Sequence, residues 1–223
     1  MMESQFSQEM LCRIERTGII AVLILDDPRH AVPTARALFE GGIESIELTL
    51  RTPAALDCLK QIIQELPEML AGVGTVLTCE QVDQVSDAGA AYAVAPGLNC
   101  NTVKHAQSRN LPFAPGVMTP SDIEAAVELG CRELKFFPAQ SAGGIKYLAS
   151  LQAPYQHLGL RFLPLGGLGP GHVEDYLADP AVLAVGGTWI ARRDMIHSEN
   201  WQAITQRAQQ ARDIVDSIRK GPQ

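Results

Sequence analysis

The sequence predicts an α/β protein that folds as a single (β/α)8 TIM barrel over residues 1–223, with an additional helix at the N-terminus. Short apolar segments recur at a regular interval, and segments with helical periodicity separate them. Gly and Pro gather where the apolar segments end, as they do at the catalytic face of a barrel. A chain of 223 residues is long enough for one such domain, and no polar linker divides it.

The apolar segments have the length and composition of buried strands, and the segments between them have those of helices. Eight buried strands alternating with helices indicate a parallel sheet closed into a barrel, with a doubly wound open sheet as the alternative. One clear helix start is Thr119-Pro120-Ser121-Asp122. The expected strands are residues 18–25, 45–50, 71–76, 91–95, 112–115, 133–138, 161–165 and 182–189. The expected helices are an amphipathic opening helix at 5–16 and segments 30–39, 54–65, 79–88, 101–109, 120–129, 144–151 and 171–177.

The composition excludes several classes of protein. With 46% hydrophobic and 19% charged residues, the chain has the balance of an ordinary globular protein rather than a disordered or fibrous one. The net charge of −7 disfavours nucleic acid or an anionic membrane as a partner, so any phosphate site must be local. The longest apolar run, residues 19–25, is far shorter than a membrane-spanning helix. We therefore expect neither nucleic acid nor a membrane as a partner.

The cysteines and histidines indicate a compartment and argue against a metal. The cysteines are odd in number, form no CxxC pair and follow no secretory leader, so we expect free thiols in a reducing cytoplasm. They are Cys12, Cys58, Cys79, Cys100 and Cys131. The five histidines have no ligand spacing such as HxH or HExxH, and we expect no metal site.

Lys135 is the most informative single residue, because it lies in an apolar segment predicted to be a buried strand. The other four lysines fall in predicted helices or in the tail, where an ammonium group reaches water. Burial disfavours the charged form of a lysine and leaves free amine to attack a carbonyl, which is Schiff-base chemistry. The alternative is a lysine held in a structural ion pair with a buried carboxylate.

The predicted strand at 45–50 continues into Arg51 and alternates strictly between apolar and polar residues. Glu47, Thr49 and Arg51 share one face, and the apolar face must meet the helices, so the polar face points into the barrel. Glu47 would lie deeper, as a proton-handling carboxylate, and Arg51 nearer the mouth, as a grip for a substrate carboxylate. The same alternation turns Lys135 and Phe137 inward. The alternative is a polar layer that simply fills the barrel interior.

Two glycine pairs occur where a barrel commonly binds phosphate, in the loops after the seventh and eighth strands. Gly166 and Gly167 follow the seventh predicted strand, and Gly186 and Gly187 precede Thr188 in the eighth. Glycine lets backbone N–H groups approach an anion closely. Two pairs at these two places predict a phosphate site, although turns explain most isolated pairs.

Seven motifs in order along nearly the whole chain resemble the 2-keto-3-deoxy-6-phosphogluconate (KDPG) aldolase family. The E-x-T-x-R and K-F-F-P-A strands are specific when they occur together at this separation. The motifs are Glu47-Leu48-Thr49-Leu50-Arg51, Gly72-Val73-Gly74-Thr75-Val76, Ala95-Pro96-Gly97, Pro115-Gly116-Val117, Lys135-Phe136-Phe137-Pro138-Ala139, Gly166-Gly167 and Gly187-Thr188-Trp189.

The resemblance implies a class I, metal-free and cofactor-free homotrimeric (β/α)8 aldolase that acts on a small molecule. It would cleave the keto-deoxy phosphosugar acid to pyruvate and glyceraldehyde 3-phosphate. Lys135 matches the Schiff-base lysine and Glu47 the general acid and base. The remaining matches are Arg51 and Thr75 for the substrate carboxylate, Pro96 and Phe137 for the pocket walls, and Gly166, Gly167, Gly187 and Thr188 for the phosphate.

Two positions depart from the family pattern. Family members often carry a small hydroxyl residue where this chain has Leu165, and a serine where it has Thr188. Thr188 keeps a hydroxyl group, whereas Leu165 removes one possible phosphate donor. Short unphosphorylated 4-hydroxy-2-oxo acids, such as 4-hydroxy-2-oxoglutarate, are therefore further candidate substrates.

Two other functions compete with the aldolase. A phosphosugar isomerase or synthase on the same barrel would share the glycine phosphate site without needing Lys135. A non-catalytic phosphometabolite-binding barrel would keep the glycines and have no use for an inward lysine and glutamate together.

Overall fold

The computed structural model describes residues 4–220, and every paired strand in that range runs parallel to its neighbour. The strands are β1 (Ile19–Leu23), β2 (Ser45–Thr49), β3 (Leu70–Gly74), β4 (Tyr92–Val94), β5 (Phe113–Ala114), β6 (Gly116–Val117), β7 (Glu133–Phe136), β8 (Arg161–Pro164) and β9 (Val185–Gly187).

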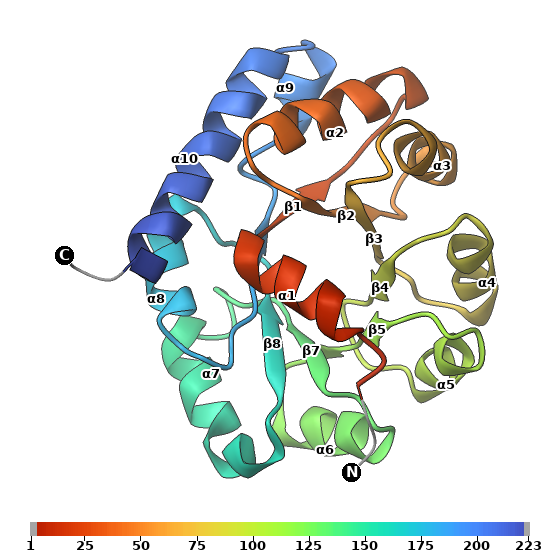
Figure 1. Cartoon of the computed structure of the whole chain (residues 1–223). Helices are drawn as coiled ribbons and strands as arrows, with labels where there is room; N and C mark the ends of the chain where they lie inside the picture. The colour runs from red at the N-terminus through yellow and green to blue at the C-terminus, as the bar shows by residue number, and fades with distance from the viewer. Residues whose placement is uncertain (1–3, 221–223) are drawn as a thin grey trace.

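Helices alternate with these strands and lie outside them (Figure 1). The α-helices are α1 (Gln8–Thr17), α2 (Ala31–Glu40), α3 (Ala55–Glu65), α4 (Cys79–Asp87), α5 (Cys100–Ser108), α6 (Pro120–Glu128), α7 (Gly144–Gln152), α8 (Val173–Leu177), α9 (Arg193–His197) and α10 (Trp201–Lys220). Three short 3-10 helices are η1 (Pro28–His30), η2 (Ala153–Leu158) and η3 (Pro170–His172).

Two parallel sheets hold the strands. Six strands form the first sheet in the order β5-β4-β3-β2-β1-β9 and curve into a half-barrel, and β6-β7-β8 form the second. Isolated bridges, Phe162 to Val182 and Leu165 to Gly186, connect the segment of β8 to that of β9. The expected strand at 112–115 is observed as β5, and Pro115, which lacks a backbone N–H, separates it from β6, which lies beyond the expected range.

The C-terminal part differs from the prediction in two ways. The strand expected at 182–189 is only β9, because Val182 pairs through a single bridge and Thr188 already belongs to a loop. Helices α9 and α10 were not expected at all. In α10, Ile204, Ala208 and Val215 are buried and form the face that packs on α2 and α8.

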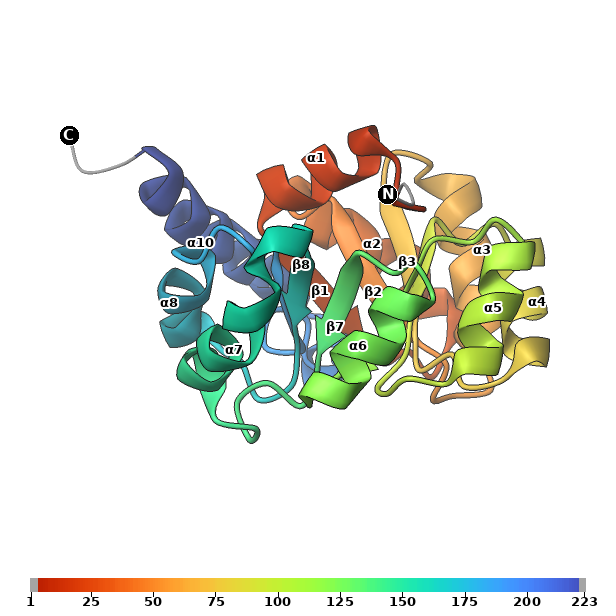
Figure 2. The same cartoon turned by 90° about the horizontal axis from the view of Figure 1, so that it is seen from below.

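The core has two parts, as expected for strands covered on both faces. Outward side chains of the strands pack against the helices, and inward side chains form a smaller cluster on the inner face of the strands. Helix α1 lies across the amino ends of the strands (Figure 2), where Phe6 is buried with its ring centroid 6.0 Å from that of Tyr92. The N-terminal segment therefore covers this end, and the carboxyl ends remain for a site.

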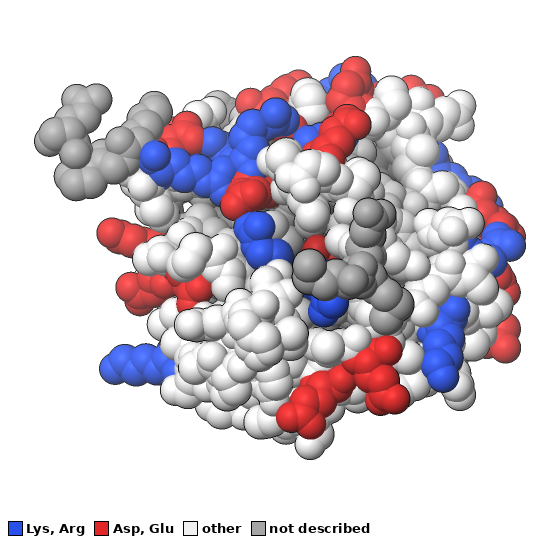
Figure 3. Space-filling model, turned by 60° about the horizontal axis from the view of Figure 1, so that its bottom comes forward, with Lys and Arg blue, Asp and Glu red and all other residues white. Residues whose placement is uncertain are grey.

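The charged side chains form no single-sign patch on the face in Figure 3, where acidic and basic groups are mixed. Several are paired, including Arg161 with Glu15 at 2.9 Å and Arg16 with Glu44 at 2.5 Å. No helix among residues 4–220 combines the length and apolar character that a bilayer crossing requires.

Candidate active site

One cavity of about 270 Å³ at the carboxyl ends of the strands gathers all ten predicted site residues. Glu47, Lys135 and the glycine loops come from segments far apart in the sequence, and the arrangement of the two sheets brings them together. The ten are Glu47, Arg51, Thr75, Pro96, Lys135, Phe137, Gly166, Gly167, Gly187 and Thr188.

Lys135 and Glu47 form a buried ion pair inside this cavity. The Lys135 Nζ lies 2.9 Å from Oε1 and 3.2 Å from Oε2 of Glu47, and the two side chains are only 5% and 3% exposed. Nζ also lies 5.4 Å from the ring centroid of Phe137, a cation–π distance. Both sequence interpretations of Lys135 thus meet in one contact, since its ion-pair partner is the carboxylate predicted to move protons.

Gly74 on the neighbouring strand makes room for the Glu47 carboxylate. A Cβ placed on Gly74 would lie 1.9 Å from Oε1 of Glu47, which no side chain could tolerate without moving the carboxylate. Thr49, the next residue on the same face toward the mouth, does not hold Glu47, because the Thr49 hydroxyl donates to the carbonyl of Leu23 at 3.0 Å. The close approach of β2 and β3 therefore positions the acid.

The floor beneath the ion pair is closed by Tyr92. Its hydroxyl donates to the carbonyl of Ile46 at 2.9 Å, lies 3.2 Å from the Ser45 hydroxyl, and has a pKa raised by burial. The phenol therefore stays protonated and takes no part in proton exchange at neutral pH.

Arg51 and Thr75 lie at the mouth of the cavity, as the alternation in the sequence predicted for Arg51. The Arg51 side chain is exposed, and it forms no salt bridge with any other described residue. Thr75 has a φ of 61°, a left-handed conformation that costs a β-branched residue energy and is found mainly at functional sites. With Lys135 and Glu47 neutralising each other, Arg51 gives the cavity a net positive charge that suits an anionic substrate.

The two glycine pairs line the opposite wall. Gly166 and Gly167 have φ values of 101° and 76°, and within residues 4–220 their N–H groups have no hydrogen-bond acceptor. The carbonyl of Gly166 accepts from the N–H of Gln140 at 3.0 Å, which fixes the loop. These free N–H groups can donate to an anion.

Leu165, where the sequence departs from the family pattern, is buried in the structure. Its side chain is only 3% exposed and belongs to the inner apolar cluster. A Cβ on Gly186 would come within 2.5 Å of the Leu165 side chain, so Gly186 is the space into which Leu165 packs. The wall beside the glycine loops is therefore apolar at this position.

Sequence reasoning did not assign Val22 and Leu168 to the site, although both line the cavity, as does Gly186 of the second predicted glycine pair. The strand that carries Val22 is apolar at every position from Ile19 to Leu23, so its sequence has no polar alternation to show which side chains face inward. Thr49, recognised in the sequence as inward-facing, also lines the cavity.

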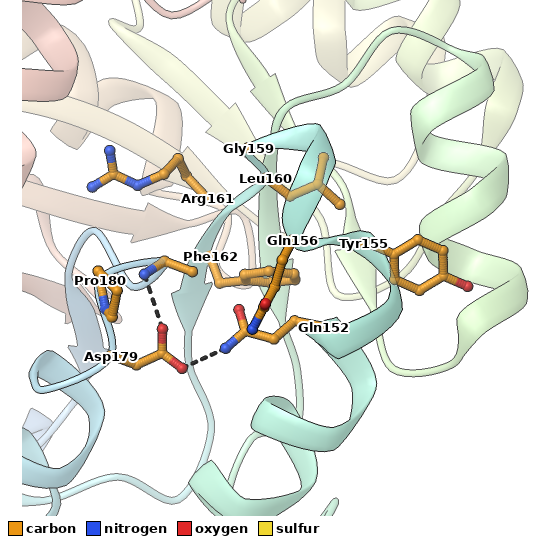
Figure 4. A pocket seen from close by; sticks show the side chains of 10 residues that line it. Gln152, Tyr155, Gln156, Gly159, Leu160, Arg161, Phe162, Asp179 and Pro180 are labelled. Atoms are coloured by element: carbon orange, nitrogen blue, oxygen red, sulfur yellow. Dashed lines mark hydrogen bonds between the residues drawn. The ribbon is translucent and has the colours of Figure 1, made fainter.

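A second pocket, of about 410 Å³, lies at the opposite end of β8 (Figure 4). Phe162 and Leu160 give it an apolar wall, and the Asp179 carboxylate accepts from the Gln152 amide and from the N–H of Ala181. Its one carboxylate is thus engaged in holding the loop, and no lysine or glutamate lines it.

A buried amine, a carboxylate in contact with it and a free guanidinium in one cavity are the groups that imine-forming carbon–carbon lyases use. The chain belongs to the KDPG and KHG aldolase family, which matches residues 11–207.

Relatives and solved structures agree with this family. The chain is 38% identical over 193 residues to the KHG/KDPG aldolase of Escherichia coli K12, covering 86% of this chain and 90% of the relative. It is 37% identical over 212 residues to the 2-dehydro-3-deoxy-phosphogluconate aldolase of Haemophilus influenzae, covering 95% and 99%. Its structure resembles the KDPG aldolase of Legionella pneumophila, captured with pyruvate as a covalent carbinolamine intermediate, with a TM-score of 0.85 at 36% identity over 89% and 96% of the two chains. It also resembles the Zymomonas mobilis enzyme with 3-phosphoglycerate, with a TM-score of 0.83 at 34% identity over 93% and 97%.

Proposed function

We propose that this protein is a class I aldolase that cleaves 2-keto-3-deoxy-6-phosphogluconate to pyruvate and glyceraldehyde 3-phosphate. The observation that carries the proposal is the contact of Lys135 Nζ with Glu47 Oε1 at 2.9 Å inside the cavity at the carboxyl ends of the strands. The family favours an aldolase over the two competing functions, an isomerase or synthase and a binding protein. Cleavage of 4-hydroxy-2-oxoglutarate to pyruvate and glyoxylate is a second activity, supported by the name of the Escherichia coli relative.

Imine formation begins with a proton transfer from Lys135 to Glu47 across their hydrogen bond. The 2.9 Å contact gives this proton a direct path from Nζ of Lys135 to Oε1 of Glu47. The free amine attacks the C2 ketone of the substrate and gives a carbinolamine. Glu47 then returns its proton to the departing hydroxyl group, so that water leaves, an iminium forms and Glu47 is a carboxylate again.

Carbon–carbon cleavage then uses the iminium as an electron sink. The Glu47 carboxylate takes the proton of the C4 hydroxyl, the C3–C4 bond breaks, and its electrons form an enamine on the Lys135 nitrogen. The aldehyde leaves. Glu47 returns the proton to C3, and water hydrolyses the pyruvate imine to restore the amine. One carboxylate serves both proton transfers, so the reaction requires no metal and no cofactor.

The remaining lining residues would hold the substrate. Arg51 and Thr75 would bind the C1 carboxylate, a role that the unpaired guanidinium at the mouth supports. Pro96 and Phe137 would form apolar walls around the C3 carbon. The free N–H groups of Gly166 and Gly167, with Gly187 and the Thr188 hydroxyl, would bind the phosphate.

Several wider features belong to the same proposal. The strands would close into one (β/α)8 barrel, with β5 and β6 as a single interrupted strand, which the bridges between β8 and β9 support. Residues 1–223 would form one domain, preceded by α1 as the additional helix. The enzyme would act in the cytoplasm as a homotrimer, as the family resemblance implies.

The test is release of pyruvate from the two substrates, measured by coupling to lactate dehydrogenase. We expect turnover of both, with the higher kcat/KM for the phosphorylated substrate, and loss of both activities in Lys135→Ala. Activity that persists in Lys135→Ala would show that the reaction does not pass through this amine.

A further inference from the structure

The amino end of α7 has no capping side chain. Its N-cap residue is Gly143, with a φ of 118°, and the N–H of Gly144 donates to the carbonyl of Ala139 at 3.0 Å. Nothing within residues 4–220 accepts a hydrogen bond from the N–H groups of Ile145 and Lys146. Such N–H groups, together with the helix dipole, attract an anion.

A small cavity of about 180 Å³ lies at this helix end. It shares no lining residue with the catalytic cavity, although Gln140, which lines it, also holds the Gly166 loop through its backbone N–H. The volume is below that of sites for drug-sized ligands and corresponds to a few water molecules. It fits a compact group such as phosphate.

Tyr176 supplies a second and independent observation. Its side chain is 1% exposed and lines the cavity, and its hydroxyl has no hydrogen-bond partner within residues 4–220. A Cβ placed on Gly144 would lie 3.9 Å from this hydroxyl, which puts the phenol against the first residue of α7. Burial raises the pKa of Tyr176 to about 12, so the group remains an O–H donor at neutral pH. A buried hydroxyl without a partner is costly, and a bound anion would satisfy it.

Two further side chains at this cavity can donate hydrogen bonds to an anion, and a third side chain would repel it. Lys146 is exposed and forms no salt bridge with another described residue. The Nδ1 of His172 accepts from the N–H of Gly169 at 3.0 Å, so the neutral ring carries its proton on Nε2 as a donor. Asp175 also lines the cavity, and its carboxylate would repel an anion.

We propose that the amino end of α7, with Lys146, His172 and Tyr176, binds a phosphate group at a site separate from the catalytic cavity. The ligand is inorganic phosphate or the phosphate of a small monoester. The backbone N–H groups of Ile145 and Lys146 would donate to its oxygens, as other helix amino ends do.

The test is a titration of 15N-labelled protein with inorganic phosphate at constant ionic strength, following backbone amide shifts. The amides of Ile145 and Lys146 should shift in a saturable way. Tyr176→Phe and Lys146→Met should each weaken the fitted affinity at these amides about tenfold, the scale of one hydrogen bond to a charged group. Asp175→Asn should strengthen it. The response of Gly166 in the catalytic cavity should keep its wild-type affinity.

Tyr155→Phe is the matched control, because it also removes one phenolic hydroxyl, which donates to Glu124 outside this cavity. It should leave the titration unchanged, and the amide spectra report whether each variant is folded. A parallel titration with glycerol 3-phosphate distinguishes the two candidate ligands. If it binds more tightly than inorganic phosphate, the ligand is a phosphate monoester, and if it binds more weakly, the ligand is inorganic phosphate. The proposal is overturned if the Ile145 and Lys146 amides do not shift, or if chloride shifts them equally.

Discussion

Replacing Glu47 with glutamine separates two roles of this residue, the transfer of protons and the structural contact with Lys135. Gln has the shape of Glu, and its amide oxygen can still accept from Lys135 Nζ, which now lies 2.9 Å from Oε1. It cannot accept a proton. We expect turnover to fall roughly 10² to 10⁴-fold, the usual contribution of general acid–base catalysis, which corresponds to about 3 to 5 kcal/mol in the barrier.

The effect of Glu47→Gln on stability should be smaller than that of a fully broken ion pair. Removing one partner of a buried pair costs about 3 to 5 kcal/mol because the other charge is left unpaired. In Glu47→Gln the amide oxygen can still accept a hydrogen bond from Lys135, whose side chain is 5% exposed, so part of the contact is kept. We therefore expect a loss of less than about 3 kcal/mol in the free energy of unfolding, measured by urea denaturation.

The assay compares turnover with imine trapping by borohydride in the same preparation. Trapping of pyruvate should survive in Glu47→Gln while turnover is lost. Glu133→Gln is the matched control, since Glu133 is also a buried glutamate, at the start of β7, but does not line the cavity. Equal losses of trapping and turnover in Glu47→Gln would refute the reasoning and leave Glu47 as a structural partner of Lys135.

Three other variants test separate parts of the account. Gly74→Ala should displace the Glu47 carboxylate and lower kcat at least tenfold. Gly171→Ala is the control, because an added Cβ there meets nothing within 4 Å, and it should leave kcat unchanged in the same assay. Leu165→Thr should raise kcat/KM about tenfold for phosphorylated substrates alone, since a hydrogen bond to a charged group contributes about 1.5 to 3 kcal/mol; equal gains for unphosphorylated substrates would contradict a phosphate role. Burial raises the pKa of Glu133, so the folded protein binds its proton more tightly than the unfolded chain and the associated stability is lost as pH rises through the folded pKa. In urea denaturation at neutral pH, Glu133→Gln should therefore have a higher free energy of unfolding than the wild type. This difference should disappear below the ordinary pKa of glutamate. A difference that stays the same at every pH would contradict the reasoning.

Much of the fold was predictable because hydrophobic residues recur with different periods in helices and in strands. Each expected strand overlaps an observed one, and the helix start at Thr119 is a capping box in which its hydroxyl accepts from the N–H of Asp122 at 3.2 Å. Helix α10 was missed because its buried stripe consists largely of small or widely spaced residues, such as Ala208 and Ala211, among glutamines and arginines. Its apolar face is recognisable only against the helices that it covers.

The site residues were predictable singly, and their contacts were not. Alternation along one strand places Glu47 and Lys135 on inward faces, which is local information. Their ion pair joins two residues 88 positions apart, on β2 and β7, which belong to different sheets, so it depends on how the two sheets lie against each other. The space that Gly74 leaves for the carboxylate likewise depends on the register of β2 and β3.

The most direct test of the central claim is reductive trapping of the imine. The wild-type protein is incubated with pyruvate and borohydride, digested, and mapped by mass spectrometry. The account predicts a reduced pyruvyl group on Lys135, and none on the other four lysines, because only the buried amine beside Glu47 is held ready to attack the ketone. An adduct on another lysine, or full activity with no adduct at Lys135, would contradict it.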